Sequence, residues 1–80
     1  MNHYLVQVSN KAFVFGSPQT VPEQNVKASL AQAGLGESWD MAQVRVYSDD
    51  QVSSLKARVE AIRDRGEVTR LSFDPLALSK

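Results

Sequence analysis

The chain has 80 residues, a hydrophobic fraction of 42% and no cysteine. Nine basic residues balance nine acidic ones, so the formal net charge is zero. This length fits one small domain, and the composition argues against an intrinsically disordered chain, a disulfide framework and a thiolate metal site. The balanced charge gives no indication of a nucleic-acid or anionic-membrane partner, and it leaves self-association open as a homodimer.

The N-terminal residues contain no basic segment followed by an apolar one, so we expect no secretory signal peptide. No apolar run approaches the roughly 20 residues that cross a bilayer. We therefore expect a cytoplasmic protein without a membrane partner.

The first quarter of the chain predicts a β-hairpin. Two segments rich in β-branched and aromatic residues, about 3–8 and 12–16, are separated by a short polar stretch. A two-residue loop at Asn10 and Lys11 would pair Val8 with Phe13 and Val6 with Phe15. We expect these four side chains to form one apolar face of the hairpin.

A helix is predicted over about 21–33. Thr20 and Glu23 have capping-box spacing, apolar residues follow at intervals of three and four, and Gly34 marks the end. The alternating segment 43–47 then predicts a half-buried strand.

The clearest helix is predicted over about 49–65. Ser48 and Gln51 form a second capping-box spacing, and apolar residues from Val52 to Ile62 repeat at three and four. The segment 67–73 predicts the last strand.

The element order β-β-α-β-α-β over residues 1–80 predicts a single α+β domain. Polar residues alternate with apolar ones in the last two strands, which indicates that one sheet face is wet. We therefore expect a two-layer α/β sandwich: a four-stranded mixed sheet with both helices on one face. The expected core comprises Val6, Val8, Phe13, Phe15, Leu30, Val44, Val46, Leu55, Val59, Ile62, Leu71 and Phe73.

Catalysis has little support in the sequence. His3 is the single histidine and has no nucleophile or orienting acid at a meaningful spacing. The adjacent Asp49 and Asp50 are explained by the positive end of a helix dipole. We expect no enzyme activity, no cofactor and no metal site.

Nucleic-acid binding is the alternative function that the sequence leaves open. The second helix and its flanking strands carry several arginines, but Glu60 and Asp64 are interleaved with them, as on an ordinary solvated face. Stacking aromatics of the kind that RNA-binding sheets use are missing, apart from Tyr47.

Protein binding has the most support. On the predicted two-layer fold, the uncovered sheet face would join Leu5 and Val14 to Arg45, Tyr47 and Arg70, and arginine with tyrosine is enriched at binding hot spots. The opposing interpretation is a set of scattered exposed apolar residues, which any protein surface has. Trp39 is a second candidate contact, either as an exposed anchor or as a side chain that closes the core.

We therefore expect a small non-enzymatic protein-binding module of the adaptor or inhibitor type, a kind of protein that phages and other mobile elements encode. The alternative is a nucleic-acid-associated accessory protein that uses the arginines of the sheet face and the second helix.

Overall fold

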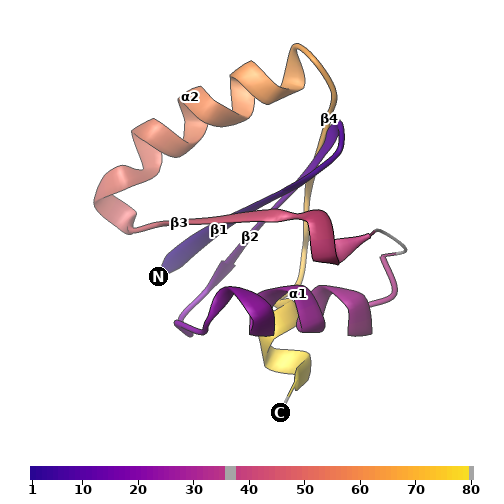
Figure 1. Cartoon of the computed structure of the whole chain (residues 1–80). Coiled ribbons are helices and arrows are strands. Elements are labelled where there is room, and N and C mark those ends of the chain that lie inside the picture. The colour runs from indigo at the N-terminus through magenta and orange to yellow at the C-terminus, as the bar shows by residue number, and fades with distance from the viewer. Residues whose placement is uncertain (36–37, 80) are drawn as a thin grey trace.

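The computed structural model describes residues 1–35 and 38–79, with side chains described up to residue 77. Its central element is a four-stranded mixed sheet flanked by two α-helices, as predicted (Figure 1). The sheet order is β3-β1-β2-β4.

The sheet has one strand that runs against the other three. β1 (Asn2–Val8) pairs antiparallel with both β2 (Lys11–Ser17) and β3 (Gln43–Tyr47). β4 (Glu67–Arg70) pairs parallel with β2 on the far side. β2, β3 and β4 therefore point in the same direction, and β4 is shorter than the predicted segment 67–73.

The hairpin register differs from the prediction by two residues. Val8 pairs with Lys11 and Val6 with Phe13, so the loop consists of Ser9 and Asn10. Ser9 carries the positive φ of 57°, whereas Lys11 stays in the strand. Because side chains alternate with a period of two, a two-residue shift leaves every side chain on its predicted face.

The helices begin later than predicted. α1 covers Glu23–Gln32 and follows Pro22 without a side-chain cap, so the predicted Thr20 cap does not form. α2 covers Val52–Arg63 and is preceded by the short 3₁₀ helix η2 (Asp49–Gln51), where the predicted Ser48 and Gln51 capping box is present.

The described residues form two further 3₁₀ helices. η1 (Trp39–Met41) precedes β3, and η3 (Pro75–Ser79) lies beyond β4.

The two helices cover opposite faces of the sheet, and the predicted two-layer arrangement with one wet face is wrong in this respect (Figure 1). α1 packs against a cluster that includes Tyr4, Val6 and Phe15, whereas α2 packs against the intervening positions Leu5 and Val14. The molecule therefore has three layers, helix on sheet on helix.

The physical reason lies in the direction of the two crossovers. The connection through α1 runs across the sheet from β2 to β3, and the connection through α2 runs back from β3 to β4. Crossovers between parallel strands are right-handed in about 98% of cases. The connection through α2 crosses the sheet in the opposite direction to the connection through α1. For both connections to be right-handed, α2 must therefore lie on the opposite face of the sheet from α1.

The two cores are unequal in size. The α1 side holds the larger aromatic and aliphatic cluster, in which the Tyr4 and Phe15 rings stack with centroids 5.0 Å apart. The α2 side is a smaller cluster around Leu5, Val14 and Leu55. Each face therefore has its own hydrophobic contribution to stability.

Two residues expected in the core lie at the surface. Val46 is 47% exposed and Phe73 is 42% exposed. Val46 is on the outermost strand and Phe73 lies beyond the end of β4, so neither is covered by a helix.

Replacing Leu5 by alanine tests the three-layer arrangement. Leu5 is fully buried beneath α2, so Leu5→Ala should lower the free energy of unfolding by about 2–5 kcal/mol. Gln7→Ala, on the same strand and face but only half-buried, should change it by less than about 0.5 kcal/mol. Urea unfolding of both variants measures the difference, and equal small effects would place Leu5 on an uncovered face.

Gly66 lies in the connection between α2 and β4, where the backbone of Asn10 comes so close that there is no room for a side chain. A Cβ at this position would lie 2.0 Å from the backbone oxygen of Asn10, which accepts a hydrogen bond from the Glu67 N–H at 2.9 Å. Gly66→Ala should therefore cost more than about 2 kcal/mol, because backbone must move.

Gly34→Ala is the matched control for this prediction. Gly34 has a φ of +75°, but the position that a Cβ would take there has no neighbouring atom within 4 Å, so its replacement should cost only about 1 kcal/mol. Thermal or urea unfolding that ranks the two variants in the reverse order would contradict the close approach at Gly66.

Candidate functional site

The predicted contact face is covered by α2. Leu5 is 0% exposed and Val14 is 1% exposed, and both belong to the core cluster beneath α2. They were predicted to be exposed because both helices were placed on the other face. Neither side chain is available to a partner in this structure.

The remaining residues of the predicted patch lie on different edges of the sheet. Arg45 and Tyr47 belong to β3 and Arg70 belongs to β4, and β1 and β2 lie between those strands. Arg45 and Arg70 are exposed, whereas Tyr47 is half-buried and packs against the α2-side core. The structure therefore keeps Arg45 and Tyr47 together but separates them from Arg70.

Trp39 is a core side chain. It is 6% exposed, packs against the α1-side cluster and contacts Phe13 edge to face, with ring centroids 5.3 Å apart. Its indole Nε1 is the one buried side-chain nitrogen or oxygen that lacks a hydrogen-bond partner within the described residues. This position is that of the core-closing side chain, not of an exposed anchor.

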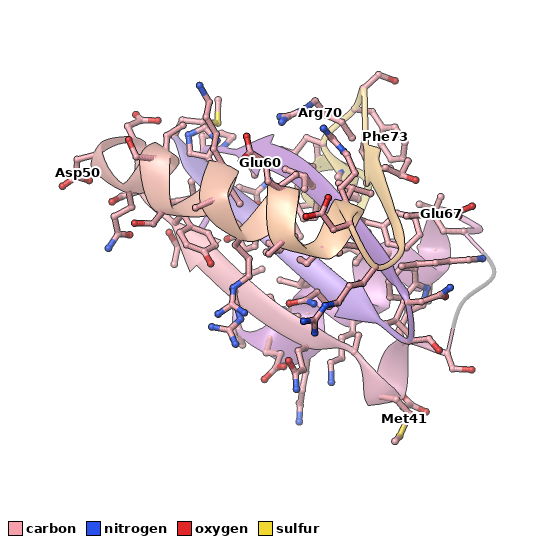
Figure 2. All side chains as sticks on the ribbon, turned by 90° about the horizontal axis from the view of Figure 1, so that it is seen from above. Met41, Asp50, Glu60, Glu67, Arg70 and Phe73 are labelled. Carbon is pink, nitrogen blue, oxygen red and sulfur yellow. The ribbon has the colours of Figure 1, made fainter. Side chains whose placement is uncertain are left out.

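The outer edge of β3 is a feature that the sequence did not indicate. In residues 1–35 and 38–79, no strand pairs with the side of β3 that faces away from β1. Val46 is exposed on this strand, and Met41, in the preceding η1, is 81% exposed at the margin of the molecule (Figure 2). Apolar side chains thus border an unpaired row of backbone N–H and C=O groups.

Position in the sheet explains why the sequence missed this edge. The alternation of β3 assigned Val44 and Val46 to the core, and Val44 does pack partly against it. Alternation reveals the face of a sheet to which a residue belongs but not its distance from the sheet's edge. Only the strand order shows that β3 is outermost.

A polar cluster joins the start of β1 to the end of β3. His3 pairs with Tyr47 in the ladder, and its Nε2 donates to Asp49 Oδ1 at 2.8 Å. The amino-terminal NH3⁺ donates to Asp49 Oδ2 at 3.3 Å. The hydrogen bond from His3, reinforced by the amino terminus, lowers the pKa of the Asp49 carboxyl below its ordinary value.

The chemistry available to this cluster is limited. Among the described residues, no hydroxyl is hydrogen-bonded to His3, and the nearby Ser48 hydroxyl is bonded to Asp50 and Gln51. Nor does the described part of the chain contain a group of three His, Cys, Asp or Glu side chains placed to hold a metal ion. The His3 and Asp49 pair fastens β1 to η2.

α2 is flanked on both sides by cations. A groove of about 220 Å³ toward β4 is lined in part by Lys56, Glu60, Arg63 and Arg70, and Figure 2 shows Glu60 and Arg70 on this side of the helix. A wider hollow of about 560 Å³ lies between α2 and the hairpin loop and includes Arg58 and Arg65.

None of these cations, nor Arg45, forms an ion pair with an acid in the described part of the chain. The alternating charges of α2 therefore do not form ion pairs with one another among the described residues.

No protein-family model, curated protein or solved structure that we compared with the chain matches it. Among residues 1–35 and 38–79, no helix combines the length and the apolar character needed to cross a lipid bilayer.

The bond between His3 and Asp49 makes stability depend on pH in a defined direction. His3→Ala should raise the pKa of the Asp49 carboxyl toward its ordinary value, because the largest cause of its lowering is removed. A lowered carboxyl pKa stabilises the fold above the unfolded-state pKa, and this stabilisation is lost as pH falls through the folded-state value. Wild type should therefore exceed His3→Ala in stability at neutral pH and converge with it in strong acid.

NMR titration of the Asp49 carboxyl measures the shift, and urea unfolding at neutral and acidic pH measures its consequence. His3→Gln, whose amide can still donate a hydrogen bond, is the control and should retain part of the lowered pKa. An Asp49 titration that is identical in wild type and His3→Ala would contradict this role of His3.

Proposed function

We propose that this chain is a small protein-binding domain of the adaptor or inhibitor type, which acts in the cytoplasm through the free edge of β3. The observation that carries the proposal is the exposure of Met41 and Val46 beside an unpaired sheet edge. Met41 precedes the first residue of β3 and Val46 is near its last, so the two exposed side chains border the same edge at its opposite ends.

The sheet edge itself supports this proposal. An edge strand presents unpaired N–H and C=O groups that can pair with another chain, and proteins usually protect such edges with charges, proline or very short strands. β4 is four residues long and three of its residues, Glu67, Thr69 and Arg70, are polar. β3 is five residues long, and Arg45 is its only charged residue.

The cations around α2 favour a second function, association with nucleic acid. About six phosphate contacts are enough for strongly salt-dependent binding. Six cations on α2, just after it or on the sheet face that it covers form no ion pair with a described acid: Arg45, Lys56, Arg58, Arg63, Arg65 and Arg70. Two facts weigh against this function. Arg45 and Arg70 lie on opposite edges of the sheet, and Glu60 and Asp64 interrupt the positive charge of α2.

A lysine at position 46 should weaken protein capture while leaving the fold unchanged. Val46 is exposed on the edge strand, so a lysine there places a charge beside the unpaired backbone and should weaken binding by about 1–2 kcal/mol, roughly tenfold. The test is affinity capture from a lysate of the native host with nuclease-treated and untreated arms, followed by mass spectrometry.

Thr69→Lys is the matched control. Thr69 is an exposed β-branched residue on the opposite edge strand, so the substitution adds the same charge at the other margin of the sheet. Proteins retained by wild type and Thr69→Lys after nuclease treatment, but depleted with Val46→Lys, support the proposal. Capture that nuclease removes, with a steep dependence on salt, supports nucleic-acid association instead.

A further inference from the structure

We propose that the free edge of β3 binds an extended acidic segment of a partner protein, with a carboxylate opposite Arg45 and apolar residues on either side of it. This inference rests on the proposed function and specifies the chemistry of the partner. The segment would add a fifth strand to the sheet.

The backbone of β3 fixes the conformation of the bound segment. In an antiparallel pair, alternate residues direct their N–H and C=O groups toward the neighbour and the others direct them away. β3 pairs with β1 over all five of its residues, from Gln43 to Tyr47. Alternate residues of β3 therefore present backbone groups outward, where only an extended chain can pair with them in register.

The side-chain pattern of β3 sets the pattern of the segment. Val44 and Val46 lie on the face that α1 covers in part, and Arg45 lies on the face of α2. Residues directly opposite each other in paired strands lie on the same face and interact. A segment that alternates apolar, acidic and apolar residues therefore matches this edge.

Within residues 1–35 and 38–79, Arg45 has no carboxylate partner. It is exposed, its neighbour in the ladder is the apolar Leu5, and it forms no ion pair with an acid among the described residues. Helical spacing places Arg58 on the flank of α2 opposite to that of Lys56, Glu60 and Arg63, which line the groove toward β4. The hollow beside Arg58 also contains Arg65 and Asp64, so its charge is mixed. The preference for an acidic residue in the segment therefore rests on Arg45 itself.

A second copy of this chain matches the edge less well. The antiparallel register that pairs all five residues of one β3 with those of another places the two Arg45 side chains directly opposite each other. Like charges at directly opposite positions are destabilising. Registers shifted by two residues avoid this contact but lose backbone pairs at both ends.

The test uses two synthetic peptides that differ in one residue: acetyl-Thr-Thr-Val-Glu-Val-Thr-Thr-amide and the same peptide with lysine in place of glutamate. Each is titrated into ¹⁵N-labelled protein and followed by NMR. Wild type should bind the glutamate peptide roughly tenfold more tightly than the lysine peptide, with amide shifts concentrated in β3. Arg45→Glu should reverse this preference.

Arg70→Glu is the matched control, because Arg70 is an exposed arginine on the same face of the opposite edge strand and should leave the preference unchanged. Equal affinities of wild type for both peptides, no binding of either, or shifts that map away from β3 would each overturn the inference. So would a wild-type dimer, seen by sedimentation, that Val46→Lys dissociates, since it would assign the edge to a second copy.

Failure of this inference can be told apart from failure of the proposed function. If lysate capture depends on Val46 while the peptides show no preference at Arg45, the protein-binding function stands and the acidic segment is wrong. If capture is unaffected by Val46→Lys, the β3 edge itself is wrong.

Discussion

Both helical connections of this protein cross between parallel strands, and connections of that kind share one hand in almost all proteins. The path from β2 through α1 to β3 and the return path through α2 to β4 run in opposite directions across the sheet. The shared hand therefore places the helices on opposite faces. The side chains of β1 are consequently buried on both sides, from Tyr4 to Val6, and a chain of only 80 residues contains two separate cores.

One helix on each face is too narrow to cover four strands. Strands lie about 4.8 Å apart, so the outer strands are separated by about 14 Å, whereas a helix with its side chains is about 10 Å across. The central strands β1 and β2 are covered first, and the outer strands remain partly exposed on both faces. Val46 and Arg45 are therefore accessible on opposite faces of β3, although neighbouring positions of β1 are completely buried.

This geometry also explains how far the sequence could predict the fold. Alternation and capping signals identified all four strands and both helices, and the hairpin faces were correct although its register was wrong by two residues. The alternation of β3 indicated a wet sheet face, but an outer strand beneath a narrow helix produces the same pattern. For this reason Leu5 and Val14 were predicted to lie on a contact surface, although α2 covers both. Of the residues predicted for that surface, Arg45 and the half-buried Tyr47 are the two that lie together, at one edge of the sheet.

In open sheets where successive crossovers diverge to opposite faces, ligands bind in the crevice beyond the carboxyl ends of the parallel strands. Here α1 follows β2 and α2 follows β3, and β1 lies between these strands and runs the other way. Its first residues occupy the position of that crevice: Asn2 donates to the Gln19 carbonyl and to Thr20, and His3 donates to Asp49. These polar side chains at the carboxyl ends of β2 and β3 therefore form hydrogen bonds within the protein. The backbone N–H and C=O groups that have no strand partner among the described residues lie along the outer edges of β3 and β4. Of these two strands, β3 is the longer, and it is the one with the exposed Val46 and Met41 beside it.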